Sequence, residues 1–365
     1  MDHSIPAGEV RIAPDALERF IARIFEASGC AAPEAARIAS HLVGANLAGH
    51  DSHGVVRVPR YVEWQREGFV VAGQRAEVVT DGGAFLLLDG GFGFGQIVAQ
   101  QATEMGIARA RAGGVCVVGL RHAGHIGRVG DYAEMAVAAG LISVHFVNVA
   151  GSVLVAPFGG AERRFSTAPI AIGVPLPEGG RLVLDFATSE VAEGKVLVAS
   201  NGGKQLPADA LITADGQPSG DPRTLYGDYP DVGPRNAADG TGAIRAFGGH
   251  KGAGLALMCE MLAGVLTGGG TSGPVSGRGR IANGMLSLYL SPAHFGDEAA
   301  FRAAAAEYVA WVKSCRPADP AAPVLAPGEP EQARRAERRA QGVPLPREAW
   351  QGILDCAASL GVAPP

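Results

Sequence analysis

A glycine-rich stretch at residues 120–134 constrains the fold of this chain most strongly, because it joins a buried strand directly to a helix. The run before it, 114–119, is short, apolar and rich in valine, which is typical of a buried strand. Residues 132–139 after it have the pattern of a helix. Between the two, glycines recur at every third position and alternate with two histidines: Gly124, Gly127, Gly130, His122 and His125.

The chemistry of this turn makes His125 the first candidate for a catalytic residue. Glycines let the backbone turn tightly and approach a ligand, and the helix that follows offers unpaired N–H groups. A histidine held there can donate or accept a proton near neutral pH. The alternative is a structural turn with two surface histidines, and this stretch alone does not distinguish the two.

The order of helices and strands predicts an α/β protein with a helical part at each end of the chain. Before any strand, apolar stripes predict amphipathic helices at 14–27, 32–47 and 58–67. Between 77 and 300, strands mix with helices without the regular βαβ spacing of a doubly wound sheet, so we expect a mixed sheet. We therefore divide the chain into a helical N-terminal part (1–76), an α/β domain (77–300) and a helical C-terminal part (301–365) that packs with the N-terminal part.

Apolar periodicity and turn residues give the remaining elements. The expected strands are 84–89, 114–119, 141–147, 167–175, 181–185 and 284–290, and the expected helices are 96–112, 132–139, 189–200, 251–266, 299–312, 330–341 and 346–360.

Composition excludes several classes of protein. A formal net charge of -5 gives no reason to expect a nucleic-acid partner. The five cysteines are scattered without metal or redox spacing, so we expect reduced thiols and a cytoplasmic protein. Residues 1–8 have neither the basic nor the apolar region of a signal peptide. The longest apolar stretches are interrupted by polar residues, so no membrane span is expected.

A second candidate group surrounds Ser52 and His53. If the chain continues helically, His53, Arg57 and Tyr61 are four residues apart and share a face, although Pro59 makes that geometry uncertain. The arginine fork suits a substrate carboxylate, and a hydroxyl or imidazole can bond the adjacent oxygen. The alternative is a helix cap at Ser52 with a surface ion pair at Arg57.

Two further segments place polar groups beside helix starts. Residues 184–189 put a carboxylate at a strand end and hydroxyls before a helix, which plain capping would also explain. Residues 247–254 form a glycine loop with Lys251 at the start of a helix. That loop is similar in kind to an anion site but lacks the spacing of a P-loop.

Two apparent motifs are rejected. The glycines at 91, 93 and 95 imitate a dinucleotide fingerprint, but Gln96 stands where a GxGxxG motif needs glycine, and no acidic strand end follows at the required distance. Several histidines could be imagined as metal ligands, but they lie on separate elements without an HExxH or CxxC scaffold, so no metal site is expected.

Taken together, these segments resemble the malate/L-lactate dehydrogenase family of the non-Rossmann type. That family includes sulfolactate and ureidoglycolate dehydrogenases, 2,3-diketo-L-gulonate reductase and reductases of cyclic imino acids. The resemblance runs over nearly the whole chain, and the order of its motifs matters more than any one of them. They lie at residues 51–61, 88–90 with 95–96, 122–133, 157–160, 168–171, 184–189, 248–252 and 327–329.

The resemblance implies a fold, an activity and an assembly. It implies a non-Rossmann α/β domain that binds NAD or NADP, a helical domain built from both chain ends, and a homodimer with the active site near the subunit interface. It implies hydride transfer between NAD(P)H and the α-carbon of a small 2-oxo or 2-hydroxy acid, a small-molecule carboxylate.

By position, the resemblance also assigns roles to residues. His125 is similar to the proton-transferring residue, with His53 and Ser52 as the other candidates for that role. Arg57 would hold the carboxylate and Tyr61 would border the substrate. The family's cofactor contacts fall on Asn148, Ser152, Asp185, Phe186, Ala187, Thr188, His250, Lys251, Pro327, Gly328 and Glu329.

Other functions remain open from the sequence. Arg57 with a histidine would equally suit a cyclic 2-imino acid such as piperideine- or pyrroline-2-carboxylate. A metal-dependent hydrolase and a non-catalytic nicotinamide-binding protein are more remote alternatives. Neither the substrate nor the choice between NAD and NADP follows from the sequence.

Overall fold

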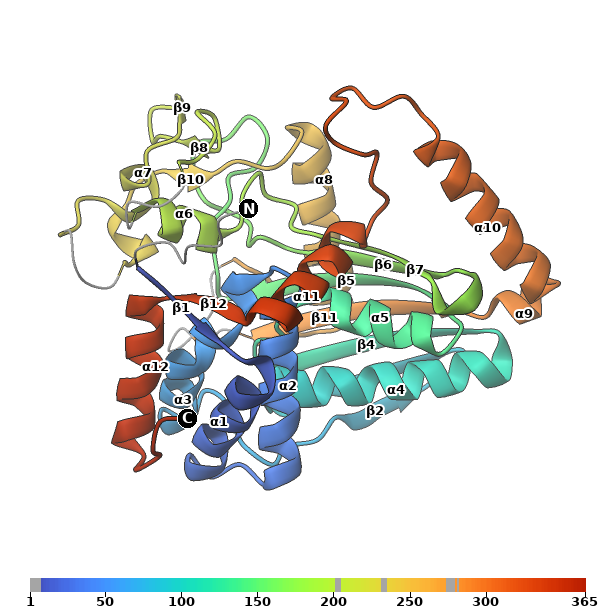
Figure 1. Ribbon diagram of the computed structural model, residues 1–365, viewed down its shortest axis with the longest axis horizontal. Coiled ribbons are helices and arrows are strands. Elements are labelled where there is room, and N and C mark those ends of the chain that lie inside the picture. Colours follow the sequence, from blue (N-terminus) through green and yellow to red (C-terminus); the bar gives the residue numbers. More distant parts are fainter. Residues whose placement is uncertain (1–7, 201–204, 231–234, 274–279, 281) are drawn as a thin grey trace.

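The computed structural model of the chain describes residues 8–200, 205–230, 235–273, 280 and 282–365. Its elements form a sheet with helices packed on both faces, a helical part built from both chain ends, and a smaller sheet above them (Figure 1). Residues 1–7, on which the signal-peptide expectation rests, lie outside the described part. No helix within the described part is long and apolar enough to cross a membrane.

The centre of the molecule is a seven-stranded mixed sheet, as predicted. The strand order is β2-β3-β4-β11-β5-β6-β7. Only β3 and β4 run parallel, and every other neighbouring pair is antiparallel. The strands are β2 (Glu77–Asp81), β3 (Phe85–Asp89), β4 (Val115–Ala123), β5 (Ile142–Ala150), β6 (Ile170–Pro175), β7 (Arg181–Phe186) and β11 (Ala282–Leu290).

Helices α4 (Gly95–Gly113) and α5 (Gly130–Ala138) cover one face of this sheet (Figure 1). Their apolar side chains join those of the strands in one core, which includes Val98, Ala102 and Tyr132. Helix α8 (His250–Cys259) continues without a break into the π-helical turn η5 (Glu260–Val265), which packs on β5 and β11. The predicted helix 251–266 is therefore one rod with a change of winding, a feature found often at functional sites.

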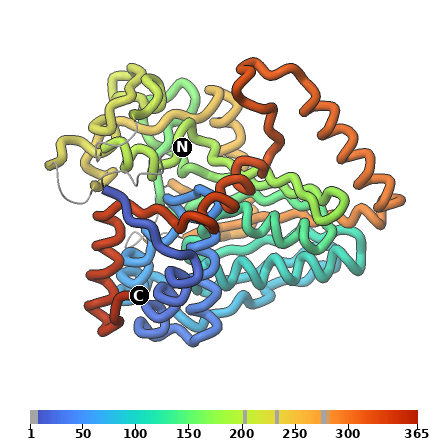
Figure 2. The backbone as a smooth tube through the Cα atoms, viewed as in Figure 1, coloured from blue at the N-terminus to red at the C-terminus, as the bar shows by residue number. Residues whose placement is uncertain are grey.

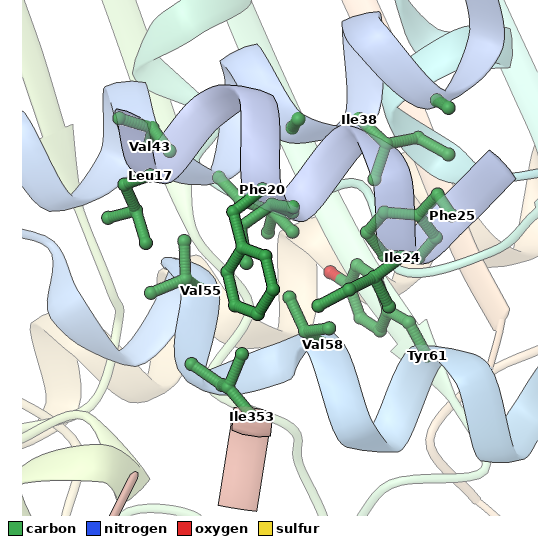
Figure 3. Close-up of a cluster of buried hydrophobic side chains, with 14 of the residues drawn as sticks. Leu17, Phe20, Ile24, Phe25, Ile38, Val43, Val55, Val58, Tyr61 and Ile353 are labelled. Atoms are coloured by element: carbon green, nitrogen blue, oxygen red, sulfur yellow. The ribbon is translucent and has the colours of Figure 1, made fainter. Parts of the chain in front are cut away.

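The two chain ends meet in the helical part (Figures 1 and 2). Strand β1 (Glu9–Ile12) pairs antiparallel with β12 (Val343–Pro346), which leads into α12 (Arg347–Ser359). Helices α1 (Pro14–Ala27) and α2 (Ala32–Leu47) have the predicted bounds, and α3 (Val58–Arg66) ends one residue early. Figure 3 shows Phe20 of α1, Val58 of α3 and Ile353 of α12 pointing into a shared core. Both terminal strands were missed, because four residues give too short an alternation to recognise.

Helix α10 (Glu298–Lys313) lies apart from the other C-terminal helices (Figure 1). It contacts α9 (Pro292–Phe295) and the turn η3 (Pro177–Gly179), and none of its residues is buried. In contrast, α11 (Glu329–Gln341) packs against α2, and α12 packs against α3. The division of the chain near residues 77 and 301 remains our proposal.

A smaller three-stranded sheet forms a separate core above the helical part. Its strands pair only over two residues each, so no periodicity announces them. They are β8 (Leu211–Ile212), β9 (Pro218–Ser219) and β10 (Ala243–Ile244), accompanied by α6 (Glu193–Ser200), α7 (Arg223–Tyr226) and η4 (Ala237–Asp239).

Two predicted boundaries were wrong for identifiable reasons. Strand β4 continues four residues beyond the predicted 119, because β11 is long enough to pair with it as far as Ala123. Helix α6 begins at Glu193 and not at 189. Ser189 instead forms a β-bridge with Ala246, and the Glu190 N–H donates to the carbonyl of Arg245. These contacts hold residues 189–190 extended beside residues 245–246.

One histidine is sealed inside the sheet. His145 on β5 is fully buried, and its ring nitrogens lie 2.8 Å from the Ser287 hydroxyl and 3.0 Å from the Ser143 hydroxyl. Burial lowers the pKa of His145 to about 3. It therefore stays neutral in the folded protein over a pH range in which an unfolded chain would charge it.

We expect the protein to lose stability on acidification because of this residue. The unfolded state binds the proton below pH 6.5, so His145 by itself should lower the free energy of unfolding by up to ~1.4 kcal/mol per pH unit from about pH 6.5 towards pH 3. Urea unfolding at several pH values measures this slope. His145→Gln should reduce the slope, whereas His294→Gln on the surface should not; equal slopes in all three proteins would contradict the prediction.

Candidate active site

The predicted residues Ser52, His53 and Arg57 lie on two successive 3-10 turns, η1 (Asp51–His53) and η2 (Val55–Arg57), which lead into α3. They do not form one continuous helix, because Gly54 between the turns is extended. The Asn46 side chain fills the space where a Cβ at Gly54 would stand, 2.1 Å from its Oδ1. That side chain accepts from the Val55 N–H (2.8 Å) and donates to Asp51 (2.7 Å).

A distant helix clamps the same segment. Arg338 on α11 donates to both oxygens of the Asp51 carboxylate, at 2.6 and 3.0 Å, and also to the carbonyl of Asn46. The Arg338 side chain is almost fully buried, so this bidentate pair is a strong constraint on η1. The C-terminal part of the chain therefore positions the Ser52-His53 turn.

The backbone of the His125 loop is held by side chains from several elements. The Ile126 N–H donates to Asn283 on β11 (2.9 Å), and the Tyr132 hydroxyl donates to the carbonyl of Ile126 (2.6 Å). The Arg128 N–H donates to His41 on α2 (3.0 Å). A Cβ on Gly95 would stand 2.5 Å from the His125 carbonyl, so α4 begins in direct contact with the loop. These contacts fix the backbone of the loop and therefore the position of His125.

The structure brings His125, Tyr61 and His53 together. The Tyr61 hydroxyl lies 2.5 Å from Nδ1 of His125. The rings of His53 and His125 are stacked, with centroids 5.6 Å apart and an angle of 10° between planes. The Ser52 hydroxyl lies 3.2 Å from Nδ1 of His53. The two predicted groups, more than 60 residues apart in sequence, therefore form one cluster.

Both imidazoles are neutral at physiological pH. Burial, followed by the charge of Arg57, lowers the pKa of His53 to about 3 and holds the pKa of His125 well below its usual range. Burial also raises the pKa of Tyr61 to about 12, so its hydroxyl is protonated before the reaction begins. This cluster can exchange protons but carries no charge of its own besides that of Arg57.

Arg57 is oriented toward this cluster by its own turn. Its Nε donates to the carbonyl of Ser52 (2.6 Å), which fixes the plane of the guanidinium. Within the described part of the chain, its two terminal nitrogens form no hydrogen bond, so they are available to a carboxylate.

A buried ion network lies behind the loop. The guanidinium of Arg128, 2% exposed, lies 3.1 Å from Asp131, 2.9 Å from Glu134 and 3.4 Å from Asp185. Burial alone would lower the pKa of Arg128, but the three carboxylates raise it. Asp185, a predicted cofactor contact, also accepts from the Gly130 N–H (2.9 Å). It joins the His125 loop to the end of β7.

The other predicted cofactor residues gather around the end of β7. The Thr188 N–H donates to the carbonyl of Thr167, and the Phe247 N–H donates to the carbonyl of Thr188. These bonds place residues 185–188 beside the glycine turn before His250 and Lys251. On the other side, the Val183 N–H donates to the carbonyl of Pro327 (3.3 Å). Gly328 has a φ of 92° and packs against Val183. A Cβ at Gly328 would stand 3.2 Å from the backbone nitrogen of Val183. Segments 250–251 and 327–329 therefore each lie close to β7 or to the residues that follow it.

Asn148 is placed differently from these segments. It is fully buried, and its amide donates to Glu260 (3.0 Å) and to the carbonyl of Gly270 (2.9 Å) while accepting from the Gly284 N–H. Its side chain therefore serves the protein interior. Ser152 lies in the turn after β5, where its N–H donates to the carbonyl of Val149.

Sequence reasoning missed several residues that build the site. Gln96, noted only because it interrupts a glycine motif, donates to the Tyr61 hydroxyl (3.1 Å) and to the His125 carbonyl (3.0 Å). His41, Arg128 and Asn283 were not singled out either. The available signal was a polar residue on an otherwise apolar face, such as His41 within helix 32–47.

Among the described residues, no group of three His, Cys, Asp or Glu side chains could hold a metal ion.

Comparison with known proteins finds similarity over nearly the whole chain. A family model described as malate/L-lactate dehydrogenase matches residues 12–354. The hydroxycarboxylate dehydrogenase B of Escherichia coli O157:H7 is 39% identical over 351 residues, covering 95% of this chain and 93% of that protein. The L-lactate dehydrogenase of Cupriavidus necator is 38% identical over 334 residues, covering 90% and 91%.

Solved structures also match nearly the whole chain. The malate dehydrogenase of Pyrococcus horikoshii OT3 superposes with a TM-score of 0.86 at 28% identity, covering 100% of this chain and 99% of that one. The delta1-piperideine-2-carboxylate reductase of Pseudomonas syringae pvar. tomato superposes with a TM-score of 0.81 at 29% identity, covering 95% and 100%.

Proposed function

The chain belongs to the malate/L-lactate dehydrogenase family, and on that premise we propose how its residues divide the work of an NAD(P)-dependent oxidoreductase acting on small 2-hydroxy and 2-oxo acids. The observation that carries the proposal is the cluster of His125, Tyr61, His53 and Arg57. It combines a proton carrier with a cation whose terminal nitrogens are available.

In the reducing direction, Arg57 binds the substrate carboxylate and thereby fixes the neighbouring carbonyl against the His125 ring. A nicotinamide cofactor bound beside this cluster would supply the hydride for the α-carbon. The developing charge on the substrate oxygen takes a proton from His125, and the reverse reaction returns that proton to the imidazole. Proton transfer by a positioned group contributes ~10²–10⁴-fold to the rate.

The residues around the end of β7 fit a nicotinamide cofactor. Helix α8 begins after two glycines with positive φ, 54° at Gly248 and 63° at Gly249, and no side chain caps its first turn. The exposed ammonium group of Lys251 suits phosphate oxygens, whereas the N–H groups of Lys251, Gly252 and Ala253 already donate to backbone carbonyls. We assign cofactor contacts to 185–188, 250–251 and 327–329. We add Ser152, in the turn after β5, to this assignment. Asn148 is fully buried with its amide bonded to Glu260 and Gly270, so it holds β5 and η5 together and does not reach the cofactor.

A cyclic 2-imino acid is the second candidate substrate. It offers the same carboxylate to Arg57 and a C=N carbon to the hydride, and a neighbouring structure is a delta1-piperideine-2-carboxylate reductase. The relatives that act on hydroxy acids are more similar in sequence, so hydroxy acids remain our leading assignment.

We test the substrate by initial rates with NADH and with NADPH against pyruvate, oxaloacetate, sulfopyruvate, 2,3-diketo-L-gulonate and the cyclic imino acids of proline and pipecolate. One fast pair is expected and would identify coenzyme and substrate together. Oxidation of ureidoglycolate is assayed with both coenzymes as well. Coenzyme binding without turnover on any of these compounds would contradict the proposed activity.

Replacing Arg57 by Lys should raise KM for the 2-oxo acid by about 10- to 100-fold, with a smaller change in kcat. A point charge replaces a fork, and one charge-assisted hydrogen bond is worth ~1.5–3 kcal/mol. Steady-state kinetics measures this change. Arg60→Lys is the control, because Arg60 lies three residues later on the exposed side of α3. An unchanged KM would remove Arg57 from the site.

We further propose that two copies of the chain form a homodimer. Helix α10 exposes Tyr308, Trp311 and Val312 on one face, and α8 with η5 exposes a second apolar row: Leu257, Met258, Met261, Val265 and Leu266. Exposed apolar surface at helical spacing is characteristic of a protein interface. An α10 without a single buried residue suits an arm that reaches a partner.

Sedimentation of the full chain tests this assembly. The wild type should sediment as a dimer, and Met261→Glu with Leu266→Glu should shift it toward the monomer, while Val78→Glu on the edge strand β2 should not. A monomeric wild type at micromolar concentration would contradict the proposal.

We also place the protein in the cytoplasm, because all five cysteines are free thiols and three of them are buried.

A further inference from the structure

We propose that Gln96 is a positioning residue that fixes the proton of His125 on Nε2, acting through the hydroxyl of Tyr61. The inference rests on the proposed function only in taking His125 as the proton carrier. The arrangement of donors and acceptors stands on the geometry alone.

The position of Gln96 allows one orientation of its amide. It is the second residue of α4, its side chain is fully buried, and its Nε2 lies 3.0 Å from the carbonyl oxygen of His125. A carbonyl oxygen can only accept, so the amide must present its NH₂ group there. The same NH₂ lies 3.1 Å from the hydroxyl oxygen of Tyr61, which therefore accepts the second amide proton.

The proton of Tyr61 then goes to His125. The hydroxyl has one hydrogen, and the Nδ1 of His125 lies 2.5 Å from its oxygen. Because Gln96 already donates to that oxygen, the hydroxyl hydrogen points at Nδ1, and Nδ1 accepts it. A neutral imidazole carries one proton, so this proton lies on Nε2, the ring nitrogen that remains for the substrate.

The relay also solves a chemical problem of a neutral donor. If Nε2–H alone gave its proton to the substrate oxygen, an imidazolate would remain. Instead, the Nε2–H bond breaks as the new O–H bond of the product forms, and the Tyr61 O–H bond breaks as Nδ1–H forms. The proton deficit ends on the Tyr61 oxygen, where the Gln96 NH₂ group stabilises it, and solvent returns the proton later. The oxidising direction runs the same exchange backwards.

One feature of Gln96 argues against a purely structural role. Its amide oxygen is buried and has no hydrogen-bond partner within the described part of the chain. An unpaired buried acceptor costs free energy, so packing alone would favour an apolar side chain. The position keeps an amide for its two donors, and both of them serve the His125 cluster.

The experiment is ¹⁵N NMR of the histidine-labelled full chain, since protonated and unprotonated ring nitrogens resonate far apart. His125 signals are identified by their loss in His125→Asn. In the wild type we expect Nε2 protonated and Nδ1 unprotonated. In Gln96→Glu the carboxylate accepts the Tyr61 proton, so Nδ1 of His125 becomes protonated and donates to the Tyr61 oxygen. Gln100→Glu, on the outer side of the same helix, carries the same charge change and should keep the wild-type pattern.

Kinetics provides the second readout. Gln96→Glu should lower kcat about 10²-fold with little change in KM, because the wrong tautomer presents a lone pair to the substrate oxygen. If Gln96→Glu does not fold, Tyr61→Phe removes only the hydroxyl and should give mixed tautomers. A wild-type tautomer in either variant, or an Nδ1-protonated wild type, would overturn the inference. A tautomer change in a protein that turns over no 2-oxo acid would instead reject the proposed function and keep the relay.

Discussion

Replacing His125 by Asn is expected to lower kcat by ~10²–10⁴-fold in both reaction directions, with little change in KM for the carboxylate substrate. The ring of His125 is hydrogen-bonded to the Tyr61 hydroxyl, and its loop is held by side chains from α2, β11 and α5. An amide at this position can fill part of the space but cannot carry the proton. Steady-state rates with the best coenzyme and substrate pair, together with coenzyme binding by fluorescence, measure the effect.

Two matched variants make this result specific. His122→Asn changes a histidine three residues earlier whose φ is 53°, a conformation that Asn tolerates, and whose Nδ1 lies 3.0 Å from Asp89. It should leave kcat within a few-fold of the wild type. His53→Asn should cost less than His125→Asn, because the nearest polar group to its ring is Ser52. A larger loss in His53→Asn would exchange the two roles.

Replacing Arg128 by Met is expected to destabilise the fold by about 3–5 kcal/mol, the usual cost of removing one partner from a buried ionic network. Three carboxylates, on Asp131, Glu134 and Asp185, would lose the cation between them. Glu134 would keep a second partner, Arg335 (3.0 Å). Among the described residues, the Asp185 carboxylate would keep only the Gly130 N–H. Urea unfolding at pH 7.5 measures the change in the free energy of unfolding.

The surface pair of Arg60 and Glu63 is the control for that measurement. It is more than half exposed on both sides, so Arg60→Met should cost at most ~1 kcal/mol. The variant Arg128→Met with Asp185→Asn should recover part of the lost stability, since one unpaired charge is removed with the cation. A cost for Arg128→Met as small as that of Arg60→Met would show that water or neighbouring groups compensate the carboxylates.

Local sequence patterns determined the elements of this protein. The bounds of α1 and α2 follow from apolar stripes at helical spacing, and the turn that carries His125 follows from its glycines. These features depend on residues within one or two turns of each other, so each segment records the face that it will bury. The resemblance to a known family added the activity and the positions of the site residues.

The tertiary structure alone decided how the site is connected. Tyr61 reaches His125 across 64 positions of sequence, Arg338 reaches Asp51 across 287, and the four-residue strands β1 and β12 join opposite ends of the chain. Gln96 looked like an interruption in a glycine motif until its two donors were placed on Tyr61 and His125. Such contacts are set by how whole elements pack, and a polar side chain carries no local period that names its distant partner.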